Sequence, residues 1–325
     1  SAVSKYPPGA ALHAAPLYAI WPEKAAIETV QGNNNPDAIP IEILIPPFGP
    51  AAVASALVVA LAMGFLALSF RKLAGGMAAL VAAYVAGLGT AAWSVAANAL
   101  WQHGPGMMWI ALAGTLATGH LISSGFAYGM AILVRPVSAF VAAPAGLYMA
   151  WQERSWQPAA KVGIGAFLGL AVLVGYNAVV FGEPSVSGGY AETFVDNATS
   201  LDMVSYLRNL ALALLSPTRG LLLWSPFLIV LLPGLGAAWR SAPSWVRGGA
   251  LGGLLYLLVQ LKANRYSGGS GFATYRYPLE ALTAAAPLLF LSYTKWVARR
   301  PTAVRAFAVA VGISIGAQAL YALVY

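Results

Sequence analysis

The feature that most constrains this chain is its apolar runs, because the sequence repeatedly extends for about 20 residues without a charged side chain. Hydrophobic residues make up 59% of the 325 residues, and charged residues make up only 9%. A helix needs about 20 apolar residues to cross the hydrocarbon of a bilayer. We therefore expect an all-α fold, a polytopic transmembrane helical bundle that forms a single domain over residues 1–325.

About ten membrane spans are predicted. They lie near residues 47–70, 76–96, 105–118, 120–134, 137–151, 162–181, 220–239, 248–263, 277–293 and 304–325. Three of these runs, between Pro105 and Trp151, have only about 15 residues, which is short of the length that crosses hydrocarbon. We expect tilted, broken or re-entrant helices among them.

If the predicted spans cross the membrane one after another, most of the positive charges fall on one side of it. Ten of the eighteen Lys and Arg residues fall on one face beside a single acid, Glu153, and the other face holds the other nine carboxylates. Cytoplasmic loops are enriched in Lys and Arg, so the first face is predicted to be cytoplasmic and the second external. The formal charge of +8 is then explained by loops that meet anionic lipid, and no nucleic-acid partner is expected. The ten basic residues are Arg71, Lys72, Arg154, Lys161, Arg240, Arg247, Lys295, Arg299, Arg300 and Arg305.

Three external regions are too long to be simple turns, namely residues 1–46, 181–219 and 262–277. The first is rich in proline, and its apolar stretch at 10–21 is too short to cross a bilayer, so we expect interfacial helices there. The chain has no cysteine, which excludes disulfides and thiolate chemistry. The sequence has no metal-site spacing of His, Asp and Glu, no phosphate-binding loop and no nucleophile elbow.

Arg135 is the charged residue that stands out most. It lies between two apolar runs and precedes Pro136. A charge near hydrocarbon costs about 2.5 to 3.5 kcal/mol at a helix centre, so it needs a partner, water or a ligand. The sequence leaves two interpretations open, a ligand-facing arginine and an arginine that snorkels to the interface.

The third external loop combines cations, aromatic rings and glycines. Residues 262–277 contain three cations, three tyrosines, a phenylalanine and three glycines. Arginine forks match phosphate oxygens, so this composition suits an anionic head group beside a sugar. An interfacial aromatic belt on a flexible loop has the same composition, and it stays an alternative. His103 lies at another turn between spans, and two interpretations stay open for it: a base or ligand contact, and a hydrogen-bonded structural residue.

Five short pieces of the sequence together resemble a known group of enzymes. They are KYPPGAAL at 5–12, LWQHGP at 100–105, LVRP at 133–136, SPTRG at 216–220 with WSP at 224–226, and GGSGF to YRY over 268–277. In this order they resemble the glycosyltransferase C superfamily, which uses polyprenyl-phosphate sugars. The likeness is to bacterial relatives of the protein O-mannosyltransferase and lipid A aminoarabinose transferase group.

The resemblance implies a hexosyl- or pentosyltransferase of the inverting type. It would move a sugar from a polyprenyl phosphate to a hydroxyl of a lipid, glycan or protein acceptor. The enzyme would lie in the cytoplasmic (inner) membrane with its active face outside, as part of cell-envelope synthesis. The family's catalytic carboxylate follows its first transmembrane helix, so we expect that base, and that helix, ahead of Ser1.

The resemblance also assigns site residues. The substrate-binding candidates are Lys5, Tyr6, His103, Arg135, Arg219, Tyr275 and Arg276, with Arg276 the leading donor-phosphate residue. Glu183 and Asp196 are candidates for a second acid or a metal contact, with solvated loop charge as the alternative. Relatives differ in their use of a divalent cation, so that cofactor stays open.

Two other functions stay open at this point. A transporter for a lipid-linked sugar would have the same basic outer pocket and would typically contain internal repeats, which the sequence lacks. A non-catalytic membrane subunit of a larger complex would need no donor site at all.

Overall fold

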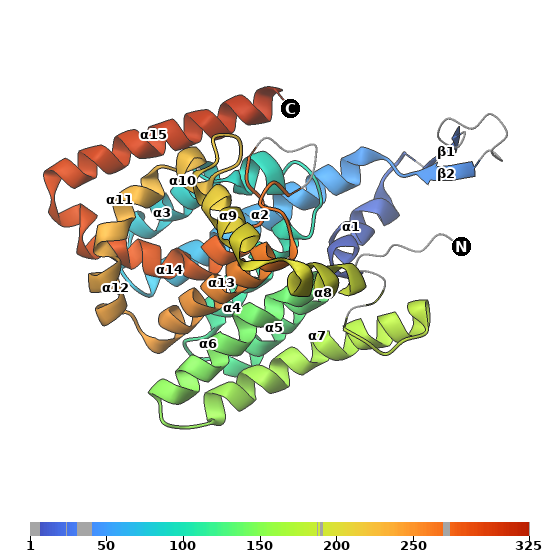
Figure 1. Cartoon of the computed structure of the whole chain (residues 1–325), viewed down its shortest axis with the longest axis horizontal. Coiled ribbons are helices and arrows are strands. Elements are labelled where there is room, and N and C mark those ends of the chain that lie inside the picture. Colours follow the sequence, from blue (N-terminus) through green and yellow to red (C-terminus); the bar gives the residue numbers. More distant parts are fainter. Residues whose placement is uncertain are drawn as a thin grey trace.

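The computed structural model describes residues 7–23, 25–30, 41–186, 188, 191–268 and 274–324. Within these ranges the chain forms fifteen α-helices and one two-stranded hairpin, gathered into an elongated bundle (Figure 1). The expectation of an all-α architecture is thus confirmed, with a hairpin added.

The N-terminal region contains one helix and the hairpin. Helix α1 (Gly9–Ile20) coincides with the predicted interfacial segment. Strands β1 (Ala26–Val30) and β2 (Ile41–Ile45) pair antiparallel and project from one end of the bundle in Figure 1. The hairpin in the second half of this loop was not predicted. Its β-branched residues are dense in both strands and favour extended backbone.

The remaining elements follow in chain order. They are α2 (Phe48–Arg71), α3 (Met77–Leu88), the π-helix η1 (Ala92–Ala96), α4 (His103–Leu116), α5 (Leu121–Val134), η2 (Pro136–Ser138), α6 (Ala139–Gln152), α7 (Gln157–Phe181), α8 (Ala191–Ser200), α9 (Met203–Leu215), α10 (Leu221–Trp224), α11 (Phe227–Leu231), η4 (Leu232–Gly234), α12 (Leu235–Ser241), α13 (Ser244–Ala263), α14 (Leu279–Lys295), η5 (Val297–Arg299) and α15 (Pro301–Val324).

The prediction of about ten spans is wrong as a count of membrane-crossing helices. In the described part of the chain, three helices are long and apolar enough to cross a bilayer, Phe48–Arg71, Gln157–Phe181 and Pro301–Leu323. Helices α4, α5 and α6 have 14 residues each, which at 1.5 Å per residue gives only about 21 Å. The predicted span at 220–239 is broken into short helices at Pro226 and Pro233, since proline removes a helical hydrogen bond. The fold is thus that of a membrane protein with a few spans.

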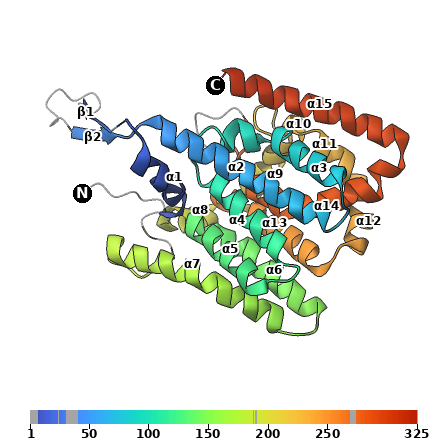
Figure 2. The same cartoon turned by 180° about the vertical axis from the view of Figure 1, so that it is seen from behind.

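Helix α4, most of which is buried, is packed inside the bundle, and the long helices lie around it. Helices α7 and α15 lie along opposite edges of the molecule in Figure 1, while α2 lies along α4 when the molecule is seen from behind (Figure 2). Helices α5 and α7 approach closely through glycines on both sides. A Cβ at Gly169 would lie 2.1 Å from the carbonyl oxygen of Gly129, and one at Gly165 would lie 2.0 Å from that of Ile122.

Turns that the charge pattern assigns to one side lie at one end of the bundle. The Nζ atom of Lys72 donates to the carbonyl of Thr115 and to Thr118 at the α4–α5 turn. A pocket at this end brings together the α4–α5 turn, Glu153, Lys161 and Trp245. The turns predicted to be external lie at the other end, and the candidate site is there.

Candidate functional site

Three ionisable side chains form a buried cluster, which we call the polar cluster: His103, Arg135 and Glu280. Arg135 Nη1 donates to Glu280 Oε1 at 3.0 Å, and His103 Nδ1 lies 2.9 Å from both carboxylate oxygens. A carboxylate only accepts, so Nδ1 of His103 carries the hydrogen. Their exposed fractions are 3% for His103, 7% for Arg135 and 0% for Glu280. The charge of Arg135 is thus met by a carboxylate within the protein.

Each member of the cluster stands where a helix begins or ends. His103 is the first residue of α4, and Glu280 lies in the first turn of α14, where the helix dipole favours a carboxylate. Arg135 stands between α5 and η2 in extended backbone, with φ −152° and ψ 107°. Proline disfavours helical backbone in the residue before it, so Pro136 ends α5 at this point. Three helix boundaries therefore bring these three polar side chains together.

Two tyrosine rings enclose Arg135. The guanidinium carbon of Arg135 lies 5.5 Å from the ring centroid of Tyr277 and 5.8 Å from that of Tyr256. The ring of His103 is 6.0 Å from that of Tyr277. These distances are typical of cation–π contacts. The two rings therefore pack near the guanidinium that Glu280 neutralises.

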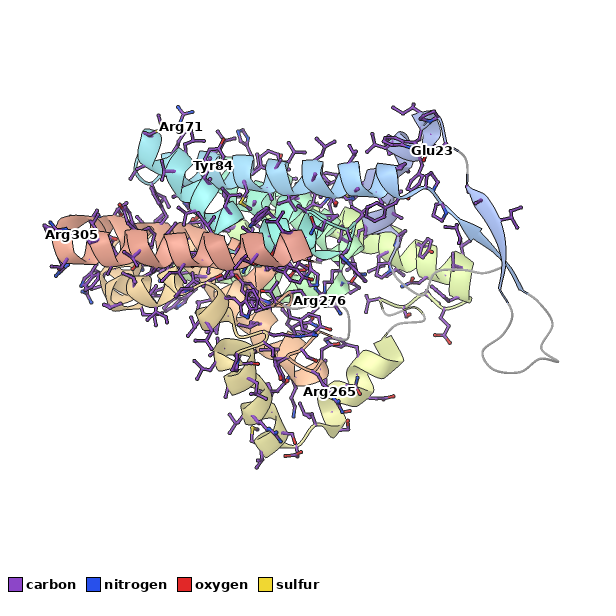
Figure 3. All side chains as sticks on the ribbon, turned by 90° about the horizontal axis from the view of Figure 1, so that it is seen from above. Glu23, Arg71, Tyr84, Arg265, Arg276 and Arg305 are labelled. Atoms are coloured by element: carbon purple, nitrogen blue, oxygen red, sulfur yellow. The ribbon has the colours of Figure 1, made fainter. Side chains whose placement is uncertain are left out.

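Tyr277 also connects the polar cluster to Arg276. The guanidinium carbon of Arg276 lies 5.1 Å from the Tyr277 ring and 5.4 Å from the ring of Trp101. Arg276 is partly exposed. Figure 3 shows Arg276 against the body of the bundle, with Arg265 of the same loop farther out. One tyrosine thus separates a buried, neutralised arginine from a second arginine nearer the surface.

Ser267 and Gly268 bring Arg219 close to Arg276. Arg219 Nη1 donates to the carbonyl of Ser267. Gly268 has φ +70°, and a Cβ there would lie 2.7 Å from Arg276 Nε. Only glycine fits this position, since other residues would be strained and would collide with the guanidinium. The predicted pair Arg219 and Arg276 therefore approaches the same two loop residues.

Tyr275 serves the core instead of an open site. Its hydroxyl lies 2.6 Å from Ser225 Oγ and 3.3 Å from the backbone nitrogen of Ala91, and Ser225 in turn donates to the carbonyl of Gly89. The residue is only 1% exposed. Tyr275 thus ties the α10–α11 turn to the loop that carries Arg276.

Helix α1 rests on the same end of the bundle. A Cβ at Gly9 would lie 2.6 Å from the carbonyl oxygen of Leu133, so the helix contacts the end of α5 directly. Trp109 Nε1 donates to His13 Nε2 at 3.0 Å. The predicted site residues Lys5 and Tyr6, which precede α1, lie outside the described residues.

The two predicted acids of the second external loop do not join the cluster. Glu183 and Asp196 are exposed, and neither forms an ion pair with a described residue. Within the described ranges, no group of three His, Asp or Glu side chains is placed to hold a metal ion. Among the described residues, Glu183 and Asp196 therefore belong to no group that could hold a metal ion.

Glu280, Tyr256 and Tyr277 were missed as site residues in the sequence analysis. Glu280 could have been found, because it is the only charged residue in the apolar run 277–293, and a charged residue inside such a run needs a partner. Tyr256 gives no such signal, since a tyrosine in an apolar helix is ordinary core.

An apolar cavity of about 380 Å³ lies beside the polar cluster. At one end it is lined by Thr90, Leu279 and Thr283, and at the other by Phe70 and Tyr293; Leu279 directly precedes Glu280, and Thr283 follows it by about one helical turn. Helices α2, α3, α11 and α14 supply most of its wall. An apolar chain segment in this cavity would meet no charged side chain among the residues that line it.

No protein-family model matches the chain, and no curated protein or solved structure is similar enough to it to count as a match.

Proposed function

We propose that this chain is a membrane glycosyltransferase that takes a sugar from a polyprenyl phosphate at the outer face of the cytoplasmic membrane. The acceptor is a hydroxyl group of a lipid, glycan or protein. The observation that carries this proposal is the convergence of the five sequence pieces on one end of the bundle.

The pieces meet in pairs although they are far apart in sequence. Gly9 of the first contacts Leu133 of the third, and His103 of the second lies against Arg135 of the third. The fourth and fifth meet twice, through Ser225 with Tyr275 and through Arg219 with Ser267. These contacts bring residues of all five pieces to one end of the bundle, which supports a shared site.

The two arginines nearer the surface have different partners from the buried one. Arg135 is neutralised by Glu280, so we assign it the role of holding Tyr277 in place. Arg276 packs on the rings of Trp101 and Tyr277, and both Arg276 and Arg219 are partly exposed, whereas Arg135 is buried. We therefore assign the departing phosphate to Arg276, with Arg219 beside it. Charge that develops on the phosphate is stabilised by such preorganised donors.

The apolar cavity suits the polyprenyl chain of the donor. Leu279, at one end of the cavity, donates its backbone N–H to the carbonyl of Arg276 at 3.1 Å. A phosphate on Arg276 would therefore have an apolar space one helical turn away, and a polyprenyl chain has the chemistry to fill it.

A non-catalytic membrane subunit is the second candidate, and the polar cluster itself favours it. A neutral, buried Arg–His–Glu group is a common way to satisfy charges inside a bundle and needs no ligand. The two candidates differ in one respect: only the first requires Arg276 for turnover.

The test is turnover of a radiolabelled polyprenyl-phosphate sugar by the full-length protein in membranes, with wild type compared with Arg276→Ala. Loss of one donor to a developing anion costs about 2 to 4 kcal/mol in the barrier, which is about a 30- to 1,000-fold fall in rate. The matched control is Arg299→Ala, an exposed arginine at the other end of the bundle, and it should keep wild-type turnover. Equal, small effects of both substitutions in folded protein would contradict the assignment.

A further inference from the structure

A second group of cations lies away from the candidate site. Arg208, Lys262 and Arg265 line a pocket of about 760 Å³ between α8, α9 and the end of α13, which we call the basic pocket. Its polar lining is completed by Asn197, Ser200, Ser205, Asn209, Asn264 and Tyr266. Figure 3 shows Arg265 on the opposite side of the molecule from Tyr84, where the chain projects beyond the bundle.

The charges of the basic pocket are not balanced by the part of the protein that the structure describes. None of the three cations forms an ion pair with a described carboxylate. Asp202, the acid nearest in sequence to Arg208, caps α9 instead, because its Oδ1 accepts from the Ser205 N–H at 2.9 Å. Lys262 donates to the carbonyl of Leu201 and lies 5.2 Å from the Tyr206 ring, which leaves its charge unneutralised. Three cations around one hollow attract an anion.

Helix α9 has three distinct faces. One face packs on α13, where Asn209 donates to the carbonyls of Leu261 and Asn264. A second face lines the basic pocket through Ser205, Arg208 and Leu212. The third face is apolar and exposed, with exposed fractions of 62% for Met203, 78% for Val204, 57% for Leu207 and 58% for Leu215. The 3.6-residue period places Arg208 at the border between the second and third faces.

This arrangement determines what kind of anion fits. An apolar helix face beside cations is the pattern of a helix that lies in a membrane interface and attracts acidic lipid. A water-soluble anion would use the cations only, whereas a lipid uses the cations and the apolar face together.

We propose that the basic pocket binds the phosphate head group of an anionic phospholipid, with its acyl chains against the exposed face of α9. The site is separate from the polar cluster and does not depend on glycosyl transfer. Its occupancy would fix α8 and α9 at the membrane surface.

Native mass spectrometry of the full chain from mixed nanodiscs tests the proposal by counting bound phosphatidylglycerol and phosphatidylcholine. Wild type should retain phosphatidylglycerol in preference. The Arg208→Gln/Lys262→Gln/Arg265→Gln variant should lose that preference by about fivefold for each charge removed. The Arg208→Lys/Lys262→Arg/Arg265→Lys variant keeps all three charges and should keep the preference.

Two further variants separate the possible sources of a signal. The matched control replaces three exposed cations of the other end, Arg240, Arg299 and Arg305, with Gln, and it should lose much less. Leu207→Asn alters only the apolar face and should also lower retention. If the triple variant does not fold, Arg265→Gln alone, at an exposed loop position, should still give about a fivefold fall.

The proposal is overturned if both triple variants lose phosphatidylglycerol equally. It is also overturned if inorganic phosphate displaces the lipid from wild type while Leu207→Asn binds as wild type does, since the pocket would then take a soluble anion.

Discussion

Glu280 has no solvent exposure, and its charge is met by Arg135 and His103. Taking charges out of water costs several kcal/mol per ion, and only good geometry with additional hydrogen bonds repays it. Glu280 has both, with three short contacts and a place in the first turn of α14. The intact ion pair therefore stabilises the folded protein more than either side chain would by itself.

We expect Glu280→Gln to destabilise the protein by about 3 to 5 kcal/mol, because the buried guanidinium of Arg135 would lose the carboxylate of its ion pair. The double variant Arg135→Met/Glu280→Met should recover most of that loss, since it removes both charges. Unfolding in detergent with increasing dodecyl sulfate measures both. Glu153→Gln, at an exposed turn, is the control and should unfold as wild type does. If Glu280→Gln is as stable as wild type, Arg135 has another partner that matters more.

His13 is the second residue whose state the geometry defines. Its Nδ1 lies 2.7 Å from the carbonyl of Gly9, which only accepts, so Nδ1 carries the hydrogen and Nε2 accepts from Trp109. Burial lowers the pKa of His13 below its ordinary value of 6.5, since it disfavours the imidazolium. The folded, docked α1 therefore prefers neutral His13.

Docking of α1 should weaken as the pH falls below about 6.5. In that range the undocked histidine binds a proton that the docked one does not, so acid favours the undocked form. Hydrogen exchange of the α1 amides, corrected for intrinsic rates, measures this at pH 7.5 and 5.5. His13→Phe should abolish the difference between the two pH values, because it has no titrating group. An unchanged α1 in wild type at both values would show that His13 does not control docking.

At the scale of elements, two glycine pairs determine how closely α5 and α7 pack. Gly125 and Gly129 face Gly165 and Gly169, each pair four residues apart. Small residues with this spacing let helix backbones approach and pack tightly in membranes. Close backbone packing, in place of large side chains, thus holds these two helices together.

Gly169→Ala should destabilise the protein by about 1 to 3 kcal/mol, because the added Cβ would overlap the Gly129 carbonyl and push the helices apart. The matched control is Gly175→Ala on the same helix, where nothing lies within 4 Å of the added atom. That change should be neutral or slightly stabilising, since alanine is the better helix former. The same detergent unfolding compares the two. Equal destabilisation by both would mean that the cost comes from the helix and not from its interface.

Helix positions could be predicted from the sequence more reliably than their lengths. Each predicted span contains a helix, because an uncharged apolar run has few other ways to satisfy its backbone. What could not be predicted is where proline divides such a run, as Pro226 does within the predicted span at 220–239. The hairpin β1–β2 could not be predicted, because the many prolines of residues 1–46 indicate a loop in this region.

At the scale of the whole molecule, sequence could identify single charges but not their partners. Arg135 was conspicuous because it interrupts an apolar run, yet its partner Glu280 is 145 residues away, and only the packing of α5 on α14 through α4 brings them together. Tyr275 was expected to contact substrate, whereas the fold uses its hydroxyl for Ser225. The cytoplasmic and external sides stay a prediction from the distribution of Lys and Arg.

The central claim is that the end of the bundle with Arg276 binds a polyprenyl phosphate whose chain lies in the apolar cavity. Photolabelling tests this most directly, with a polyprenyl phosphate that carries a diazirine on its chain. Peptides of the full-length protein would then be mapped by mass spectrometry. The account predicts adducts on α3 and α14, competed by unlabelled polyprenyl phosphate and greatly reduced in Arg276→Ala. Competable adducts confined to the outer surfaces of α7 or α15, or the same labelling in Arg276→Ala as in wild type, would contradict it.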